Sequence, residues 1–166
     1  MEDLYIRKVA NGDEVILAYI QTESWKAAFK NIITDDLLVK YTEINRATEM
    51  YLKLLKNKKG NGYILEVNGN PHCMAWWDTT RESNMSGYAE LICIHSLPDN
   101  WRNGYGSKMM DRVLGDIRQA GYENVMLWVF TENRRACSFY ETKGFVATDN
   151  IKAALGVTET MYIYKF

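Results

Sequence analysis

Cysteine is scarce in this sequence of 166 residues, and its three copies, Cys73, Cys93 and Cys137, are far apart. An odd number of widely spaced cysteines, with no Cys-x-x-Cys pair, argues against both a disulfide framework and a zinc site. We therefore expect no bound metal. Few cysteines without a disulfide pattern are typical of a reducing compartment, so the sequence predicts a cytoplasmic protein.

An excess of charge of one sign is also missing. The 20 Lys and Arg residues are balanced by 21 Asp and Glu residues, which leaves a formal net charge of -1. Such a balance gives no overall attraction to nucleic acid or to an anionic membrane surface. We expect neither of them as a partner.

Long hydrophobic runs are absent as well. No segment approaches the ~20 apolar residues that a membrane-spanning helix needs. The first residues place Glu2, Asp3, Arg7 and Lys8 around a short apolar stretch, which is not the basic-then-apolar layout of a signal peptide. With 47% hydrophobic residues, the chain is long enough for one packed core and too short for two ordinary ones. The sequence predicts a soluble protein with one domain over residues 1–166.

The first third of the chain reads as one strand followed by helices. Leu4–Arg7 is a strand candidate, and Asp13 is placed to act as the N-cap of a helix. Apolar residues then recur at helical spacing from Val15 and continue in a stripe as far as Ile33. A second helical stretch holds Met50–Leu55.

A β-hairpin and a further strand follow these helices. Tyr63–Val67 and Cys73–Trp77 are apolar runs separated by Asn68-Gly69, and this pair accepts the positive φ angles of a tight turn. We expect the next strand, Tyr88–Ser96, to pair antiparallel with the second arm of the hairpin.

The last part of the chain alternates helices and strands. The pattern predicts a helix over Met109–Ile117 and a strand over Val125–Phe130, which together with the preceding strand form a strand, helix, strand crossover. Another helix over Asn133–Lys143 ends at Gly144, and the residues Thr160–Phe166 have the composition of a closing strand. This order is that of an α/β (α+β) protein.

The most informative segment runs from Pro98 to Met110 and leads from a strand through a glycine-centred turn into a helix. A helix start has unpaired backbone N–H groups and partial positive charge, so it is a natural seat for a phosphate. Gly104 and Gly106 lack a Cβ, which permits unusual φ angles and lets phosphate oxygens approach the amides. The segment predicts an anion site made of main-chain groups.

A second informative segment is Trp128–Phe145. Asn133 is placed to cap a helix in which Ala136, Phe139 and Tyr140 recur at spacings of three and four. This spacing puts the phenol of Tyr140 on the face of the helix that looks toward the two crossover strands.

The two segments together, Trp-Arg-Asn-Gly-Tyr-Gly-Ser followed by Asn-Arg-Arg-Ala-Cys-Ser-Phe-Tyr-Glu-Thr-Lys-Gly-Phe, resemble the GNAT superfamily, the Gcn5-related N-acetyltransferases. The start of the chain, with Ile6-Arg7, Asp13 and Ser24–Phe29, is also similar to bacterial members. The resemblance implies a single GNAT domain with a mixed, twisted sheet, flanked by helices, whose central parallel strands splay apart to receive acetyl-CoA. Here those strands are Tyr88–Ser96 and Val125–Phe130.

The resemblance also implies which residues hold the co-substrate. Trp101 takes the first position of the family's phosphate loop, where Gln or Arg is commonest, and Asn133 matches the asparagine that holds the arm of the coenzyme. The backbone N–H that stabilises the oxyanion lies where the strand bulges, around Ile94 to Ser96. The full set is Ile94, Ser96, Trp101, Arg102, Asn103, Gly104, Tyr105, Gly106, Ser107, Asn133 and Tyr140.

Direct acyl transfer to an amine needs a base, donors for the oxyanion and an acid for the departing thiolate. Tyr140 matches the family's acid. Glu90 aligns with a strand glutamate that is the base in the histone-acetylating branch, and His95 near the end of that strand is the other candidate base. No covalent intermediate is required, so none of the cysteines is nominated as a nucleophile.

The resemblance implies an acetyl-CoA-dependent N-acetyltransferase that acts on a primary amine of a small molecule or peptide. One alternative is a GNAT-fold protein that binds acyl-CoA with weak or lost catalysis. Another is a nucleotide-phosphate protein, since Gly106-Ser107-Lys108 resembles part of a phosphate loop, but the spacing of that motif is missing. A strand at the end of the chain leaves a pairing edge that would suit a homodimer, and the sequence does not identify the amine.

Overall fold

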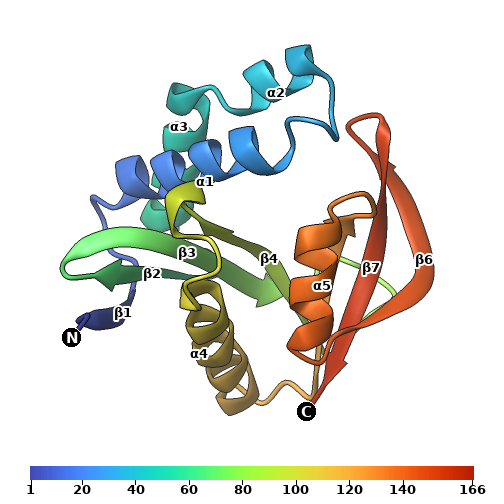
Figure 1. Ribbon diagram of the computed structural model, residues 1–166. Helices are drawn as coiled ribbons and strands as arrows, with labels where there is room; N and C mark the ends of the chain where they lie inside the picture. Colours follow the sequence, from blue (N-terminus) through green and yellow to red (C-terminus); the bar gives the residue numbers. More distant parts are fainter.

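The computed structural model describes residues 1–166 apart from the side chain of Asn100. Seven strands form one mixed sheet in the spatial order β1-β2-β3-β4-β5-β7-β6 (Figure 1). The strands are β1 (Leu4–Lys8), β2 (Asn61–Val67), β3 (Asn70–Thr79), β4 (Tyr88–Ser96), β5 (Asn124–Phe130), β6 (Val146–Ala154) and β7 (Val157–Lys165). The helices are α1 (Glu14–Ala28), α2 (Asp35–Tyr41), α3 (Ile44–Lys56), η1 (Pro98–Asn100), a 3-10 turn, α4 (Tyr105–Gln119) and α5 (Arg134–Thr142).

The expected hairpin is confirmed. β2 and β3 pair antiparallel, and both residues of the connecting turn have positive φ angles, 51° at Asn68 and 78° at Gly69. This geometry suits the right-handed twist of the flanking strands. β4 then pairs antiparallel with β3, also as expected.

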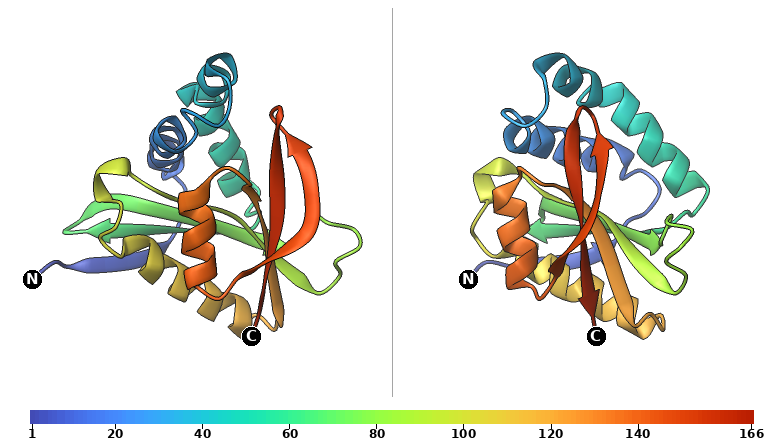
Figure 2. Two further views of the ribbon diagram at one scale, coloured as in Figure 1. Left: turned by 45° about the vertical axis from the view of Figure 1, so that its right-hand side comes forward. Right: turned by 90° about the vertical axis from the view of Figure 1, so that its right-hand side faces the viewer.

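Helices cover both faces of the sheet, and each face has its own core. On one face, Leu17 and Ile20 of α1 and Tyr51 of α3 pack against Ile64 and Trp76 of the hairpin. On the other face, the stripe of α4 packs with the opposite side of β2, β3 and β5, and α5 adds Cys137 and Tyr140. Figures 1 and 2 show α1, α2 and α3 together on one side of the sheet, with α4 and α5 on the other.

The first helix differs from the expectation at both ends. Asp13 stands at the N-cap position, but its side chain makes no capping hydrogen bond; instead it accepts hydrogen bonds from Arg7 and from the backbone of Ala10. The helix ends at Ala28, and the apolar stripe beyond it is buried without being helical, because Phe29 and Ile33 pack against Phe130 of β5. Burial in the core, and not a helix, therefore explains the apolar residues between Phe29 and Ile33.

The two central parallel strands diverge. β4 is nine residues long, yet it pairs with β5 only from Tyr88–Glu90, opposite residues 124–126. Beyond Glu90, β4 stays with β3, while β5 stays with β7 along its whole length. The splayed strands that the sequence predicted are therefore confirmed, and they open a gap inside the sheet.

The sequence analysis missed β6. Most of its side chains are exposed, and their pattern does not alternate, so no apolar signal marks it as a strand. It forms because it pairs antiparallel with β7 as the edge of the sheet. The loop between these strands brings Ala154 and Leu155 against the core that contains Phe29 and Phe130.

Candidate active site

A cavity of about 1040 Å³ lies where β4 and β5 diverge. Its walls come from both ends of the chain: α1, α3, β3, β4, the first turn of α4, β5, α5 and the β6–β7 hairpin. The cavity is as large as the pockets that bind cofactors and drug-sized ligands. Most of the residues singled out in the sequence line it, namely Ile94, His95, Ser96, Trp101, Arg102, Gly104, Tyr105, Gly106, Ser107, Asn133 and Tyr140. Glu90 and Asn103 are not among the lining residues.

The loop before α4 turns its backbone toward the cavity. Arg102 and Gly104 have left-handed φ angles of 67° and 80°, and Gly104 is the N-cap of α4. The first helical hydrogen bond runs from the amide of Lys108 to the carbonyl of Gly104, at 3.1 Å, a usual length for such bonds. The N–H groups of Tyr105, Gly106 and Ser107 precede it and have no partner within the helix. They form a cradle suited to an anion.

The two glycines of this loop have different reasons to be glycine. At position 104 glycine is required because the φ angle is positive. The φ angle of Gly106 is not positive, which corrects the expectation for this residue. A Cβ on Gly106 would meet the ring of Phe139 at 3.7 Å and the hydroxyl oxygen of Ser96 at 4.0 Å, both ordinary van der Waals distances. The protein itself therefore has room for a side chain at Gly106.

Trp101 anchors the loop. Its indole Nε1 donates a hydrogen bond of 3.0 Å to the carbonyl oxygen of Ser96 at the end of β4. The guanidinium carbon of Arg135 lies 3.4 Å from the centre of the indole ring, a cation–π contact. Trp101 thus joins the end of β4 to the first turn of α5, the helix that follows β5 in the chain.

Two cations stand at this end of the cavity. Arg102 and Arg135 both line it, and burial followed by the charge of Arg102 lowers the pKa of Arg135. Nearby, Lys143 donates a hydrogen bond of 2.9 Å to the hydroxyl of Ser107 and also pairs with Asp111. Guanidinium groups are suited to phosphate oxygens. This end of the cavity is therefore electropositive, although the formal net charge of the whole chain is -1.

Tyr140 projects from α5 into the cavity. It is buried among the rings of Phe139, Phe145 and Tyr162, and among the described residues its hydroxyl has no hydrogen-bond partner. Burial raises the pKa of this phenol, and the charge of Arg135 opposes the shift only in part. The hydroxyl therefore keeps its proton at neutral pH and can donate it. Asn133 positions this helix, since its side-chain oxygen accepts a hydrogen bond of 3.3 Å from the amide of Ala136.

The two candidate bases lie in different surroundings. The carboxylate of Glu90 is only 2% exposed and is held by Arg81, which donates from its backbone at 3.0 Å and from its guanidinium at 2.6 and 3.1 Å. Burial pushes the pKa of Glu90 up, but these hydrogen bonds and the charge of Arg81 outweigh it and hold the pKa below its usual value. Glu90 is thus an ion-paired carboxylate outside the cavity lining. Its role as a base stays a prediction.

His95 lines the cavity and is partly buried. Burial, followed by the charge of Arg135, lowers the pKa of its imidazole to about 4. The ring is therefore neutral at physiological pH, so it is able to accept a proton but holds it weakly. His95 also stays a predicted base.

The bulge in β4 lies earlier than expected. The register of β3 against β4 shifts between Trp76, opposite Cys93, and Trp77, opposite Leu91, so Ile92 is the extra residue. The sequence analysis placed the irregularity around Ile94 to Ser96, where the pairing with β3 is regular. The bulge falls two residues after Glu90, the last residue of β4 that pairs with β5, and a bulge bends the strand that carries it.

The sequence analysis missed several charged residues of the cavity lining, which are Arg46, Lys59, Asp78, Arg81, Arg135 and Glu159. Arg135 stands two positions after Asn133 in the second motif, and this closeness was a usable signal. Glu159 on β7 also lines the cavity. Its position gave no signal, because the face it occupies depends on the pairing of β7 with β5 and with the unforeseen β6.

The described residues include no group of three or more His, Cys, Asp and Glu side chains placed to hold a metal ion. Likewise, none of the helices in the described part of the chain combines the length and the apolar character of a membrane span.

Fold and site together define a class: an α/β protein with a glycine-capped helix start beside the gap between two diverging parallel strands. The chain belongs to the acetyltransferase (GNAT) family, whose signature it matches over residues 27–145. It is therefore a member of a family of N-acetyltransferases, as the sequence resemblance implied.

Individual relatives are similar along much of the chain. An uncharacterised N-acetyltransferase of Methanocaldococcus jannaschii is 29% identical over 119 residues, which cover 69% of this chain. The chain spans only about half of that relative, 52% of its length. Among solved structures, the PaiA N-acetyltransferase of Thermoplasma acidophilum in complex with coenzyme A has a TM-score of 0.85 at 17% identity, with 99% of each chain covered. The acetyltransferase YncA of Salmonella typhimurium with acetyl-CoA has a TM-score of 0.72 at 15% identity, covering 98% of this chain and 94% of that one.

Proposed function

We propose that this protein transfers the acetyl group of acetyl-CoA directly to a primary amine of a small molecule or peptide. The observation that carries the proposal is the arrangement of one cavity: backbone amides of the loop Trp101–Ser107 at one end, and the protonated phenol of Tyr140 beside the gap between β4 and β5. The coenzyme A and acetyl-CoA complexes of the two structural relatives support this assignment of the cavity.

The residues present fit the co-substrate. The amides of Tyr105, Gly106 and Ser107 would receive the pyrophosphate, and the missing Cβ of Gly106 lets its oxygens come close. Arg102 and Arg135 would add charge-assisted hydrogen bonds. Ile94 to Ser96 lie along the side of β4 that β5 has left, so their backbone groups are available to the arm of the coenzyme and to the oxyanion.

Tyr140 would act on the leaving group. The amine nitrogen forms a bond to the thioester carbonyl carbon, the carbon–sulfur bond breaks, and the sulfur takes the proton of the Tyr140 hydroxyl. The resulting tyrosinate regains a proton from the nitrogen of the new amide. Burial raises the pKa of this phenol, so the hydroxyl is protonated in the ground state and available to the sulfur as the carbon–sulfur bond breaks.

Calorimetry with acetyl-CoA and a coenzyme A release assay test this proposal, with butylamine, phenethylamine, spermidine and short peptides as acceptors. We expect saturable binding of acetyl-CoA and turnover with at least one amine. Tyr140→Phe should lower kcat by about 100-fold and leave the Kd of acetyl-CoA nearly unchanged. Tyr162→Phe is the matched control, since Tyr162 packs next to Tyr140 but is not a lining residue of the cavity. Lack of acetyl-CoA binding would refute the proposal.

One observation favours a second candidate, a protein that binds acyl-CoA but has little activity. The predicted base Glu90 is fully engaged by Arg81, as described above. Tight acetyl-CoA binding, with no amine in the panel giving release above the rate of hydrolysis, would select this alternative.

A further inference from the structure

The end of the cavity away from the phosphate loop carries a carboxylate that no part of the proposed chemistry uses. Two acidic side chains, Asp78 and Glu159, are among the described lining residues. The carboxylate of Asp78 accepts a hydrogen bond of 2.8 Å from the adjacent amide of Thr79. Within the described chain Glu159 accepts no hydrogen bond, although its side chain is only 19% exposed.

The position of Glu159 on the sheet places it beside the gap. In the β5–β7 ladder Glu159 stands opposite Phe130, the last residue of β5, and on the other side it stands opposite Lys152 of β6. Directly opposed residues of neighbouring strands project from the same face of a sheet. Phe130 belongs to the core with Phe29 and Ile33, so Glu159 faces the side covered by α1 and α2. This is the face opposite to that of α4 and α5.

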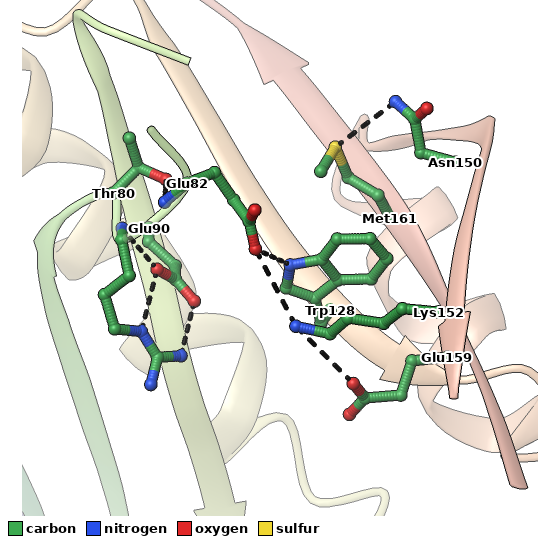
Figure 3. A network of polar contacts seen from close by, with 9 residues as sticks. Thr80, Glu82, Glu90, Trp128, Asn150, Lys152, Glu159 and Met161 are labelled. Atoms are coloured by element: carbon green, nitrogen blue, oxygen red, sulfur yellow. Dashed lines mark hydrogen bonds and ion pairs between the residues drawn. The ribbon is translucent and has the colours of Figure 1, made fainter. Parts of the chain in front are cut away.

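The charges around Glu159 leave it incompletely neutralised. Lys152 is 3.9 Å from its carboxylate, but the same ammonium is 3.7 Å from Glu82 and lies 4.1 Å from the ring centre of Trp128, so it is shared (Figure 3). Arg81 also faces this region, but its guanidinium is bound to Glu90. Thus Lys152 is shared between Glu82 and Glu159, and Arg81 is already paired with Glu90.

We infer that Glu159 is the acceptor-side carboxylate: it binds the ammonium group of the acceptor and takes the proton that the amine must lose before attack. This inference rests on the proposed acetyl transfer. The carboxylate of Glu159 accepts one proton from the ammonium, the neutral amine then attacks the thioester carbon, and Glu159 releases its proton to solvent after the product has left.

The environment of Glu159 fits this role. Burial raises its pKa, Lys152 and Arg81 oppose the shift, and Glu90 adds to it. A carboxylate with a raised pKa is a stronger base than an exposed one. Glu90 has the opposite shift because Arg81 holds it. Of the two glutamates, the one that lines the cavity also has the more suitable proton affinity.

The test compares Glu159→Gln with Glu82→Gln in the coenzyme A release assay, using the amine of the above panel with the highest kcat/KM. Both substitutions remove a carboxylate that pairs with Lys152, but Glu82 is not a lining residue of the cavity. We expect Glu159→Gln to lower kcat/KM for the amine by about 100-fold near neutral pH. The deficit should shrink as the pH rises and solvent deprotonates the amine. Glu82→Gln should stay within about threefold of the wild type.

Calorimetry with acetyl-CoA separates the possible failures. If the Kd of acetyl-CoA is unchanged in Glu159→Gln while amine kcat/KM falls, the inference is supported. An active wild type together with a Glu159→Gln variant of equal kcat/KM overturns it and leaves the proposed function standing. A deficit that does not change with pH also overturns the role in proton transfer. A wild type without acetyl-CoA binding overturns both proposals.

Discussion

At the scale of single residues, the site depends on where side chains are missing as much as on where they are present. Gly106 lies in the first turn of α4, has no positive φ angle, and has space for a methyl group within the protein. Nothing in the fold alone requires glycine there. In the proposed complex, glycine is needed at this position because a phosphate must approach the backbone amides closely.

Gly106→Ala should therefore separate binding from folding. Alanine in a helix is more stable than glycine by up to about 1 kcal/mol, so the melting temperature should be unchanged or higher. The Kd of acetyl-CoA should rise about tenfold or more, because the methyl group occupies the space of the phosphate. Thermal unfolding and calorimetry measure the two effects.

Gly115→Ala is the control for this substitution. Gly115 lies in the same helix, and a Cβ there would have no neighbour within 4 Å. It should give the stabilisation without the loss of affinity. If Gly106→Ala bound acetyl-CoA as tightly as Gly115→Ala does, the phosphate would not lie against the first turn of α4.

At the scale of elements, the phosphate loop is fixed by side chains from its neighbours rather than by its own sequence pattern. Trp101 reaches back to β4 through its hydrogen bond to Ser96 and forward to α5 through Arg135. This gives a physical role to the residue that departs from the common Gln or Arg of the family loop. It holds two elements in place and leaves the phosphate contacts to the backbone.

Trp101→Phe should weaken acetyl-CoA binding by about fivefold. The phenyl ring keeps its contact with Arg135 but lacks the N–H that bonds to Ser96, and one such hydrogen bond contributes about 1 kcal/mol. Trp101→Ala loses both contacts and should bind more weakly still. The affinities are measured by calorimetry at constant ionic strength.

A second indole tests whether loop anchoring is the cause. Trp77→Phe removes a hydrogen bond of 3.1 Å to the hydroxyl of Tyr63 in the core, away from the cavity lining. It should lower stability with little change in the Kd of acetyl-CoA. Equal losses of affinity in Trp77→Phe and Trp101→Phe would mean that general destabilisation, not the loop, sets the binding.

At the scale of the whole molecule, β4 and β5 are bridged by charged groups from distant segments. The loop after β3 supplies Arg81 to β4 and Glu82 to Trp128 of β5, while Lys152 of β6 lies beside Trp128 (Figure 3). At the opposite end of the gap, Trp101 connects the end of β4 to α5. The splayed sheet is thus held at both ends of its opening.

The stability of this bridge should depend on pH in a definite direction. The pKa of Glu90 is lowered in the folded protein, so its pairing with Arg81 stabilises the fold above the ordinary carboxyl pKa and is lost as the pH falls through the folded-state value. Arg81→Met leaves a carboxylate that is 2% exposed without its cation. We expect a loss of about 2 kcal/mol in the free energy of unfolding near neutral pH.

That deficit should diminish in acid, where Glu90 of the variant takes up a proton and no longer needs a partner. Urea unfolding at several pH values measures it. Lys26→Met, which removes an exposed pair with Glu23, is the control and should change stability by less than about 1 kcal/mol. A deficit of Arg81→Met that stays constant down to strongly acidic pH would contradict the assignment of Glu90 as the buried charge.

Local patterns in the sequence determined the elements that carry strong periodic or turn signals. The stripe of α4, the turn at Asn68-Gly69 and the glycine loop before α4 each depend on neighbouring residues only, because helix burial, turn geometry and N-terminal dipoles are local properties. The loop proposed to bind phosphate and the position of Tyr140 on α5 could be predicted for the same reason. Together they identified the family.

Tertiary structure alone decided which charges reach the cavity. Glu90 looked like an available carboxylate in the sequence, but Arg81 from the loop before β4 neutralises it. Glu159 gave no signal, since its orientation depends on an edge strand, β6, that exists only through its pairing with β7. Side-chain environment depends on contacts between residues far apart in the chain, and one sequence does not state those contacts. The loop proposed to bind the donor could therefore be found from sequence, whereas the groups proposed to meet the acceptor required the fold.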